Sequence, residues 1–211
     1  GISGSGNKNF GALRIFDVDG LTASTVNQPI SASNGEYDPE MKISRRWLYT
    51  YGGGTGWQGI NDNAAVPPGQ GFTMKGLGYT NHDQLYDFRG RPNNGTITTP
   101  IVSSAFILSG NPYPSALDLN KVFWENDKID TFYFWDENHD INGHTYIVNQ
   151  GGYGTWTPGG TEYDATGTNA GIYVVAPFYS YNNSGTSTGT TNGSGLSYER
   201  RFAPVGQGFM L

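Results

Sequence analysis

Cysteine is absent from this chain, and charged residues are scarce. Without cysteine the protein has no disulfide, no thiolate metal site and no cysteine nucleophile. Charged residues make up 14% of the sequence, whereas about a quarter is typical of soluble domains. The 18 acidic and 12 basic residues include no run of Lys or Arg that could follow a phosphate backbone or an anionic lipid surface. Nucleic acids and membrane surfaces are therefore poor candidates as partners.

Long apolar segments and sustained helical periodicity are missing as well. No stretch approaches the length of a membrane-spanning helix, so we expect no membrane insertion. Gly, Pro or Asn interrupts nearly every segment with an apolar stripe at helical spacing. The best helical candidate covers residues 115–126, where Leu117, Val122 and Phe123 share one face. The sequence therefore predicts very little helix.

Glycine, aromatic residues, Asn, Ser and Thr take the place of the missing charges, with 32 Gly, 14 Tyr and 11 Phe. Short aromatic or β-branched segments alternate with turn clusters such as Gly52-Gly53-Gly54 and Asn93-Asn94-Gly95. The spacing predicts an all-β fold built from antiparallel β-sandwich or jelly-roll-like modules. The expected strands cover residues 13–16, 47–51, 72–74, 85–88, 101–108, 131–135, 145–148, 172–176 and 209–211.

An internal repeat divides the chain. Residues 67–74, PPGQGFTM, recur as residues 204–211, PVGQGFML, and each copy follows a pair of arginines. We expect a turn that starts at proline, two glycines that allow unusual torsions or a close approach, and then a strand whose Phe points inward. Two related modules follow, residues 1–98 and 99–211. Residues 181–195, nearly all Asn, Ser, Gly and Thr, are expected to form a long polar loop in the second module.

Four segments resemble a known family. They are residues 88–95 (FRGRPNNG), 110–118 (GNPYPSALD), 132–136 (FYFWD) and 204–209 (PVGQGF). Together they resemble the repeated β-rich region of large Bacteroidetes surface proteins that the type IX secretion system exports. The resemblance covers roughly residues 41–211 and implies a cell-surface or extracellular location without catalytic residues. It also implies that the chain is a processed product or part of a longer protein.

Catalytic chemistry finds little support in the sequence. No nucleophile elbow or phosphate-binding loop is present, and the three histidines are scattered. Carboxylates of the second module, such as Asp136, Glu162 and Asp164, lie among aromatic residues as in glycosidases. Aspartates in turns, however, are ordinarily local capping residues. We therefore expect no enzyme, with a glycosidase as a minor alternative.

The sharpest metal pattern is the alternation Asp136, Asn138, Asp140 and Asn142 after an aromatic strand. Calcium loops use such alternation because six to eight oxygens must converge on one ion. Ile141 and Ile147 stand where an EF-hand has glycine and a bidentate glutamate. A plain hairpin loop and a calcium site both remain open, and no other cofactor is expected.

Exposed tryptophans are candidates for binding sugar rings. Trp57 and Trp156 each have Gly and Thr within two residues in turn-like stretches, so they are the best candidates for exposure. Large aromatics in a helix-poor domain more often form the core between sheets. The same residues thus fit packing and glycan binding.

Two functions remain. The first is a non-enzymatic extracellular or cell-surface structural or adhesive protein, whose partners are other copies of itself or other extracellular modules. An unpaired sheet edge would accept a strand from a neighbour, and repeated head-to-tail pairing would produce an extracellular filament. The alternative is a carbohydrate-binding module of a secreted polysaccharide-acting protein.

Overall fold

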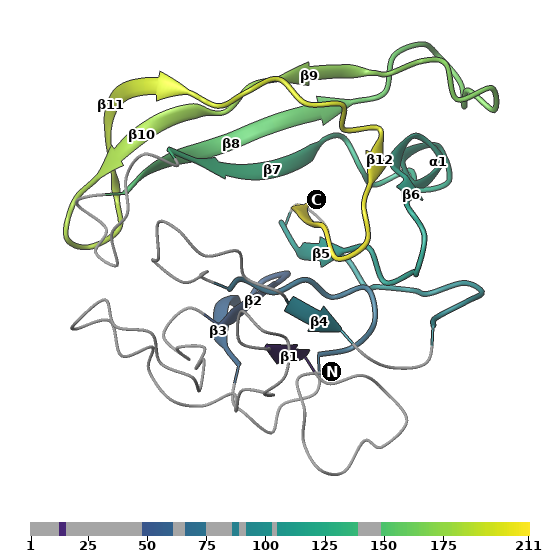
Figure 1. Ribbon diagram of the computed structural model, residues 1–211, viewed down its shortest axis with the longest axis horizontal. Helices are drawn as coiled ribbons and strands as arrows, with labels where there is room; N and C mark the ends of the chain where they lie inside the picture. The colour runs from purple at the N-terminus through teal and green to yellow at the C-terminus, as the bar shows by residue number, and fades with distance from the viewer. Residues whose placement is uncertain are drawn as a thin grey trace. The chain divides into compact units, whose positions relative to one another are not determined.

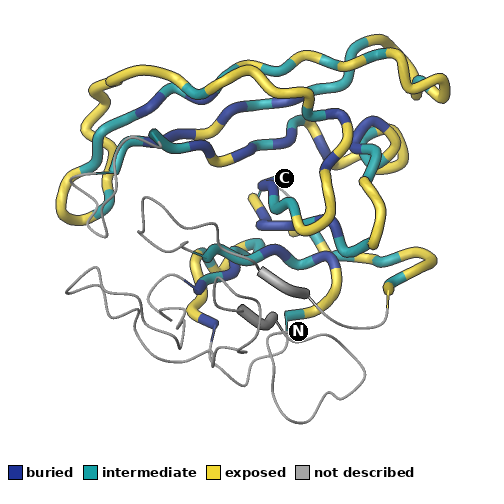
Figure 2. The backbone as a smooth tube through the Cα atoms, in the orientation of Figure 1, coloured by how far each residue is buried: buried dark blue, intermediate teal, exposed yellow. Residues whose placement is uncertain are grey.

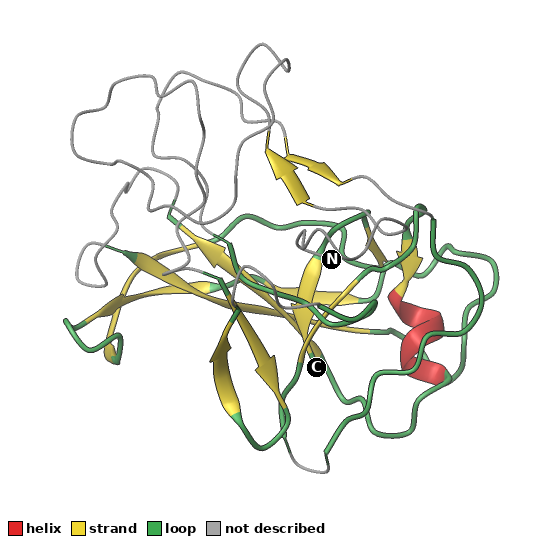
Figure 3. Ribbon diagram, turned by 90° about the horizontal axis from the view of Figure 1, so that it is seen from below, coloured by secondary structure: helices red, strands yellow, loops and turns green. Residues whose placement is uncertain are grey.

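The computed structural model describes residues 13–15, 48–60, 66–74, 86–88, 92–102, 105–138 and 149–211 (Figure 1). All strand pairs with a described register are antiparallel. The only helix in these residues is α1 (Leu119–Trp124), which lies inside the expected helical segment (Figure 3). The expected all-β fold with very little helix is confirmed.

The chain divides into two compact units, Gly1–Pro114 and Ser115–Leu211. This division lies later than the expected boundary between residues 98 and 99. The reason is that the intervening residues bond to the first unit: the Gly71 N–H donates to the Leu108 carbonyl at 2.9 Å. The Asn93 side chain donates to the Pro112 carbonyl at 2.7 Å. A sequence repeat locates similar motifs, whereas these contacts decide to which unit the connecting residues belong.

Short antiparallel pairings make up the described part of the first unit. A hairpin joins β2 to β3, β1 pairs with β4, and β5 is bridged to the segment around Gln70. The Leu48, Ile60, Ile107 and Leu108 side chains are buried. The strands are β1 (Leu13–Ile15), β2 (Tyr49–Gly52), β3 (Gly56–Gly59), β4 (Tyr86–Phe88) and β5 (Leu108–Gly110).

One main antiparallel sheet forms the second unit, with the order β11-β10-β8-β7-β13 (Figure 1). β9 and β10 follow one another along the same edge of β8, because Val174 pairs with Thr155 and Tyr179 with Gly151. A short pair, β6 and β12, lies beside α1. The strands are β6 (Leu117–Asp118), β7 (Phe132–Glu137), β8 (Gln150–Thr157), β9 (Ile172–Val174), β10 (Pro177–Tyr181), β11 (Ser187–Ser194), β12 (Phe202–Ala203) and β13 (Gly208–Met210).

The repeated motif forms the same turn in both units. The Gln70 N–H donates to the Pro67 carbonyl at 3.1 Å, and the Gln207 N–H donates to the Pro204 carbonyl at 3.1 Å. The third turn residue has a positive φ in each copy, +87° at Gly69 and +78° at Gly206, which favours glycine. The repeat therefore encodes the local geometry that the sequence predicted.

The segments that follow the two turns differ, because residues 208–210 form β13 whereas residues 71–74 make only an isolated bridge at Thr73. Phe209 is buried in the second unit, as expected, whereas Phe72 is half-buried in the first. At Gly71 the expected close approach is present, because a Cβ there would collide with the Ser109 carbonyl. The inward direction of the Phe is thus confirmed for the second copy only.

An aromatic core fills the inner face of the second-unit sheet. The ring of Phe132 lies 5.6 Å from those of Trp156 and Phe209, measured between centroids, and Phe134 lies 6.1 Å from Phe209. These rings alternate with outward residues along β7 and β8, and Figure 2 shows the resulting alternation of burial.

The expected exposure of Trp156 is wrong, because this side chain is 0% exposed. Its indole Nε1 donates to the Ala170 carbonyl at 2.9 Å. A Cβ at Gly171 would lie 2.6 Å from the same ring, so glycine there lets the backbone close over the indole. Trp156 therefore belongs to the core and is not available to stack on a sugar.

The expected long loop at residues 181–195 is also wrong. Residues 182–186 form a short turn in which the Asn182 side chain accepts hydrogen bonds from the Ser184 and Thr186 N–H groups. The chain then returns as β11 along β10. Its Ser, Thr, Asn and Gly residues suit a strand with both faces in water, since every residue of β11 is exposed (Figure 2).

Candidate functional site

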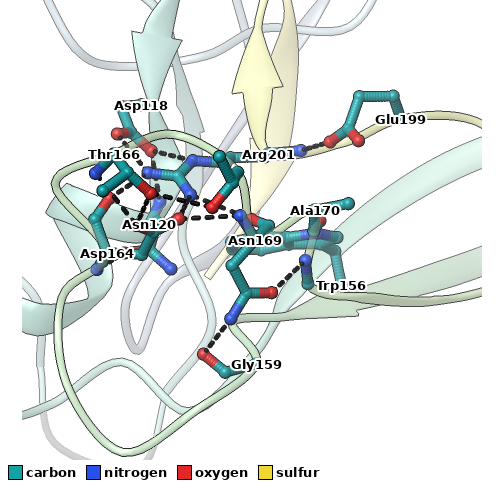
Figure 4. Close-up of polar contacts among 12 residues, drawn as sticks. Asp118, Asn120, Trp156, Gly159, Asp164, Thr166, Asn169, Ala170, Glu199 and Arg201 are labelled. Atoms are coloured by element: carbon teal, nitrogen blue, oxygen red, sulfur yellow. Dashed lines mark hydrogen bonds and ion pairs between the residues drawn. The ribbon is translucent and has the colours of Figure 1, made fainter.

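Arg201 is a buried charge, with 1% of the residue exposed (Figure 4). Its Nε and Nη2 donate to the two carboxylate oxygens of Asp118 at 3.2 and 3.0 Å. Nη1 donates to Asp164 Oδ2 at 2.6 Å and to the Asn169 carbonyl at 2.9 Å. Nη2 also donates to the Asp164 carbonyl at 2.6 Å. These bonds occupy the donors of the guanidinium group.

The acceptors around Arg201 belong to two parts of the second unit. Asp118 is the N-cap of α1 and accepts from the Asn120 N–H at 3.0 Å. Asn120 in turn accepts from the Asp164 N–H at 3.1 Å. The loop between β8 and β9 contributes Asp164 and Asn169. Arg201 thus joins the start of the helix, this loop and the segment that enters β12.

The carboxylate of Asp164 is committed to local hydrogen bonds. The Thr166 hydroxyl, the Asn169 N–H and Arg201 hold the pKa of Asp164 well below its usual range, with the Thr166 contact the largest cause. Hydrogen bonding to Asp118 is the main cause that raises the pKa of Arg201. Both shifts favour the charged forms at neutral pH, which fits a structural role for the Arg201 network.

The outward face of the second-unit sheet presents a different chemistry. Trp135 on β7 is 46% exposed, because its neighbours Phe132 and Phe134 occupy the inward positions. Tyr153 lies directly opposite Trp135 on β8, with ring centroids 5.1 Å apart and planes at 71°. Tyr181 on β10 lies 6.1 Å from Trp135 at 46°. We call Trp135, Tyr153 and Tyr181 the aromatic face.

Gly151 allows the indole of Trp135 to lie against the sheet. A Cβ at Gly151 would be only 2.6 Å from Cζ2 of Trp135. The Gly151 carbonyl also accepts a hydrogen bond of 3.0 Å from the Tyr181 hydroxyl. Burial raises the pKa of that hydroxyl, so it remains a donor at neutral pH. The aromatic face is therefore held in place on its inner side while its outer side is open to solvent.

Of the two tryptophans expected to be exposed, the structure confirms Trp57. It is 50% exposed and lies opposite Tyr51 in the hairpin of β2 and β3, with centroids 5.0 Å apart and planes at 72°. The aromatic face was not among the sequence candidates. Its signal was present in residues 132–136, because alternation forces one of two neighbouring aromatics outward.

The calcium candidates are only partly described. The Asp136 carboxylate accepts from the Glu137 N–H at 3.0 Å, and the Asn138 N–H donates to the Gln150 carbonyl at 2.8 Å, beside the pairing of β7 with β8. Asp140 and Asn142 lie outside the described residues. Within the part of the chain that the structure describes, no three His, Cys, Asp or Glu residues cluster as metal ligands. Calcium binding stays a prediction.

A family model described as a domain of unknown function (DUF8693) matches residues 23–211. No curated protein and no solved structure matches the chain. Separately, none of the described helical segments has the length and hydropathy of a membrane span.

Removing the central cation should destabilise the second unit. We expect Arg201→Met to lower the free energy of unfolding by about 3 kcal/mol, because it leaves two carboxylates without their buried partner. Chemical denaturation measures this change. Lys121→Met is the matched control: it breaks an exposed ion pair of 3.6 Å with Glu125 and should cost less than about 0.5 kcal/mol. Equal effects of the two substitutions would contradict a structural role for Arg201.

Acid should weaken the same network. Because the pKa of Asp164 is lowered by folding, its contribution to stability is complete above its unfolded pKa of about 4. It is lost as the pH falls from there through the folded pKa. We expect Asp164→Asn to reduce the loss of unfolding free energy on acidification, measured by denaturation between about pH 2 and pH 6. Glu162→Gln, on the same loop, is the control, and an unchanged acid profile for Asp164→Asn would refute the assignment.

Proposed function

We propose that this chain, which belongs to the DUF8693 family, is a non-enzymatic extracellular module that binds glycans through the aromatic face of its second unit. The observation that carries the proposal is the exposed indole of Trp135, held against Gly151 on one side and open on the other. Contiguous exposed apolar surface commonly marks a binding site. The chemistry of the aromatic face indicates which class of ligand would bind there.

The axial C–H groups of a pyranose form an apolar face that stacks on an aromatic ring, while the hydroxyls around the ring need polar partners. Trp135 provides such a ring, and Tyr153 meets it edge to face. By strand alternation Glu137 lies on the same outward face as Trp135, where its carboxylate can accept from sugar hydroxyls. A carboxylate beside the ring disfavours an anionic ligand. A neutral glycan is therefore the ligand class that fits best.

The angles between the rings narrow this class. Trp135 lies at 71° to Tyr153 and at 46° to Tyr181, so the three rings are not coplanar. A flat crystalline polysaccharide surface needs coplanar rings to stack on all of them at once. One sugar unit can stack on the indole and contact a tyrosine edge. The geometry supports binding of single, soluble glycan chains.

Two further parts of the proposal rest on other observations. The extracellular location rests on the resemblance to exported Bacteroidetes surface proteins and on the Gly-, Asn-, Ser-, Thr- and Tyr-rich composition. The non-enzymatic role is supported by Asp164, one of the carboxylates available to a glycosidase, because Arg201, Thr166 and Asn169 occupy it.

A panel of neutral hexasaccharides tests the proposal: cellohexaose, xylohexaose, mannohexaose and laminarihexaose. We expect at least one to bind in calorimetry, and Trp135→Ala to weaken binding at the second unit about tenfold or more, because a stacked aromatic anchor contributes about 1.4 kcal/mol or more. Soluble or amorphous polysaccharide should retain the protein better than a crystalline form.

Trp124→Ala is the matched control, because Trp124 is also exposed but lies at the end of α1, edge to face with its neighbour Phe123. It should leave binding unchanged. Absence of binding to every member of the panel, or unchanged binding sites in Trp135→Ala, would refute glycan recognition by the aromatic face.

A specific observation also favours a second role, assembly with another copy of the chain. β11 lies at the end of the sheet order, and among the described strands it pairs only with β10. Its sequence, STGTTNGS, has no charged residue and no proline, the residues that commonly protect an edge strand. We propose that β11 accepts a strand from a second copy, which would extend the sheet towards a filament.

Electron microscopy and light scattering of concentrated protein test the assembly role. Filaments or discrete oligomers are expected for the native chain, and Thr190→Lys should abolish them by placing a charge on the edge. Ser184→Lys, in the turn before β11, should leave assembly intact. A strictly monomeric native chain at the highest attainable concentration would exclude assembly through β11.

A further inference from the structure

The two units each carry an exposed tryptophan in a closely similar aromatic pair. Trp57 lies opposite Tyr51 in the first unit, with ring centroids 5.0 Å apart and planes at 72°. Trp135 lies opposite Tyr153 in the second unit, at 5.1 Å and 71°. In both pairs the partners are directly opposite residues on neighbouring antiparallel strands, and the indole is the more exposed ring.

The hairpin that carries Trp57 contains no charged residue. Residues 49–59, which form the whole hairpin, contain Gly, Tyr, Thr, Trp and Gln only. Gln58 next to Trp57 is exposed, and its amide provides both a donor and an acceptor for sugar hydroxyls. For the second unit, glycan binding was proposed from an exposed indole with the polar side chain of Glu137 on the same face. Beside Trp57 the neutral amide of Gln58 takes that place.

The hairpin is also anchored in place. The Thr73 N–H donates to the Tyr49 carbonyl at 2.8 Å, and the Tyr49 N–H donates to the Thr73 hydroxyl at 3.1 Å. The Ile60 N–H donates to the carbonyl of the buried Leu48 at 2.9 Å, just beyond the hairpin strands. These bonds fix the open end of the hairpin, where both strands join the rest of the unit. Trp57 is therefore presented by an ordered element, and little ordering entropy is lost on binding.

We infer that Tyr51 and Trp57 form a second glycan site and that the chain is bivalent for neutral, single glycan chains. This inference rests on the proposed function, because it assigns the same ligand class to both aromatic pairs. A bivalent molecule holds two glycan chains, or two segments of one chain, and so can connect polysaccharides. Each unit contributes one complete site from its own strands.

The number of sites per chain tests the inference directly. We expect calorimetry with the bound hexasaccharide of the panel to give two sites in the native protein. Trp57→Ala and Trp135→Ala should each retain one site, and the double variant should retain none. Trp124→Ala should keep both. Melting curves of each variant establish that the two units remain folded.

Indole N–H signals in an NMR spectrum provide a second readout. The native protein is titrated, so the result does not depend on whether a variant folds. The signals of Trp57 and Trp135, assigned by comparison with the single variants or with conservative Trp→Phe variants, should shift with added hexasaccharide. The signals of the buried Trp156 and of the control Trp124 should not.

The outcomes separate the two proposals. One site per native chain, lost in Trp135→Ala and unaffected by Trp57→Ala, would overturn the second site while leaving the proposed function intact. Unchanged binding sites in Trp135→Ala, or no binding to the panel, would overturn the proposed function and with it bivalence.

Discussion

The guanidinium group of Arg201 organises the second unit. A buried cation is costly unless its donors are matched, and here the Asp118 carboxylate, Asp164 and the Asn169 carbonyl match them. The consequence extends beyond the ion pairs. Asn169 precedes the Ala170 carbonyl that accepts from the indole of Trp156, so the loop that Arg201 holds also closes over the core. With Trp156 and its neighbours filling the inner face, alternation along β7 leaves the outer face for Trp135.

Contacts between aromatic rings and glycine backbone explain part of the glycine- and aromatic-rich composition. A bulky indole can lie flat on a strand only where the facing residue has no Cβ. Gly151 provides that space for Trp135, and Gly171 provides it for Trp156. Gly154 leaves room for the Tyr173 ring in the same way. At these three positions glycine accompanies an aromatic ring because a Cβ would collide with that ring.

Local signals in the sequence were sufficient to predict turns and short strands. They failed where contacts between residues far apart in the sequence decide burial or strand pairing. The turns at residues 67–70 and 204–207 follow from proline and glycine at fixed positions, and the all-β fold follows from short strands between turn clusters. Trp57 and Trp156 both have Gly and Thr within two residues in the sequence, yet one is exposed and the other fully buried. The difference comes from Ala170, Gly171 and Phe132, which reach only Trp156. Residues 181–195 show the same limit, because pairing with β10 makes a strand of a segment whose composition predicts a loop.

The aromatic pairs are not a simple product of the internal repeat. Trp57 lies shortly before the turn at Pro67, whereas strands β8 to β12 separate Trp135 from the turn at Pro204. The order of Tyr and Trp along the chain is also reversed between the units. Edge-to-face contact is a general preference of aromatic rings, so the similar angles follow from direct cross-strand pairing at two independent places. Exposure does not follow from that preference. Trp156 shows that this fold can bury an indole completely, and core packing accounts for its position. Strand alternation places Trp135 outward but does not require a ring as large as an indole at an exposed position. The proposed glycan ligand would give a reason for an indole at Trp57 and Trp135.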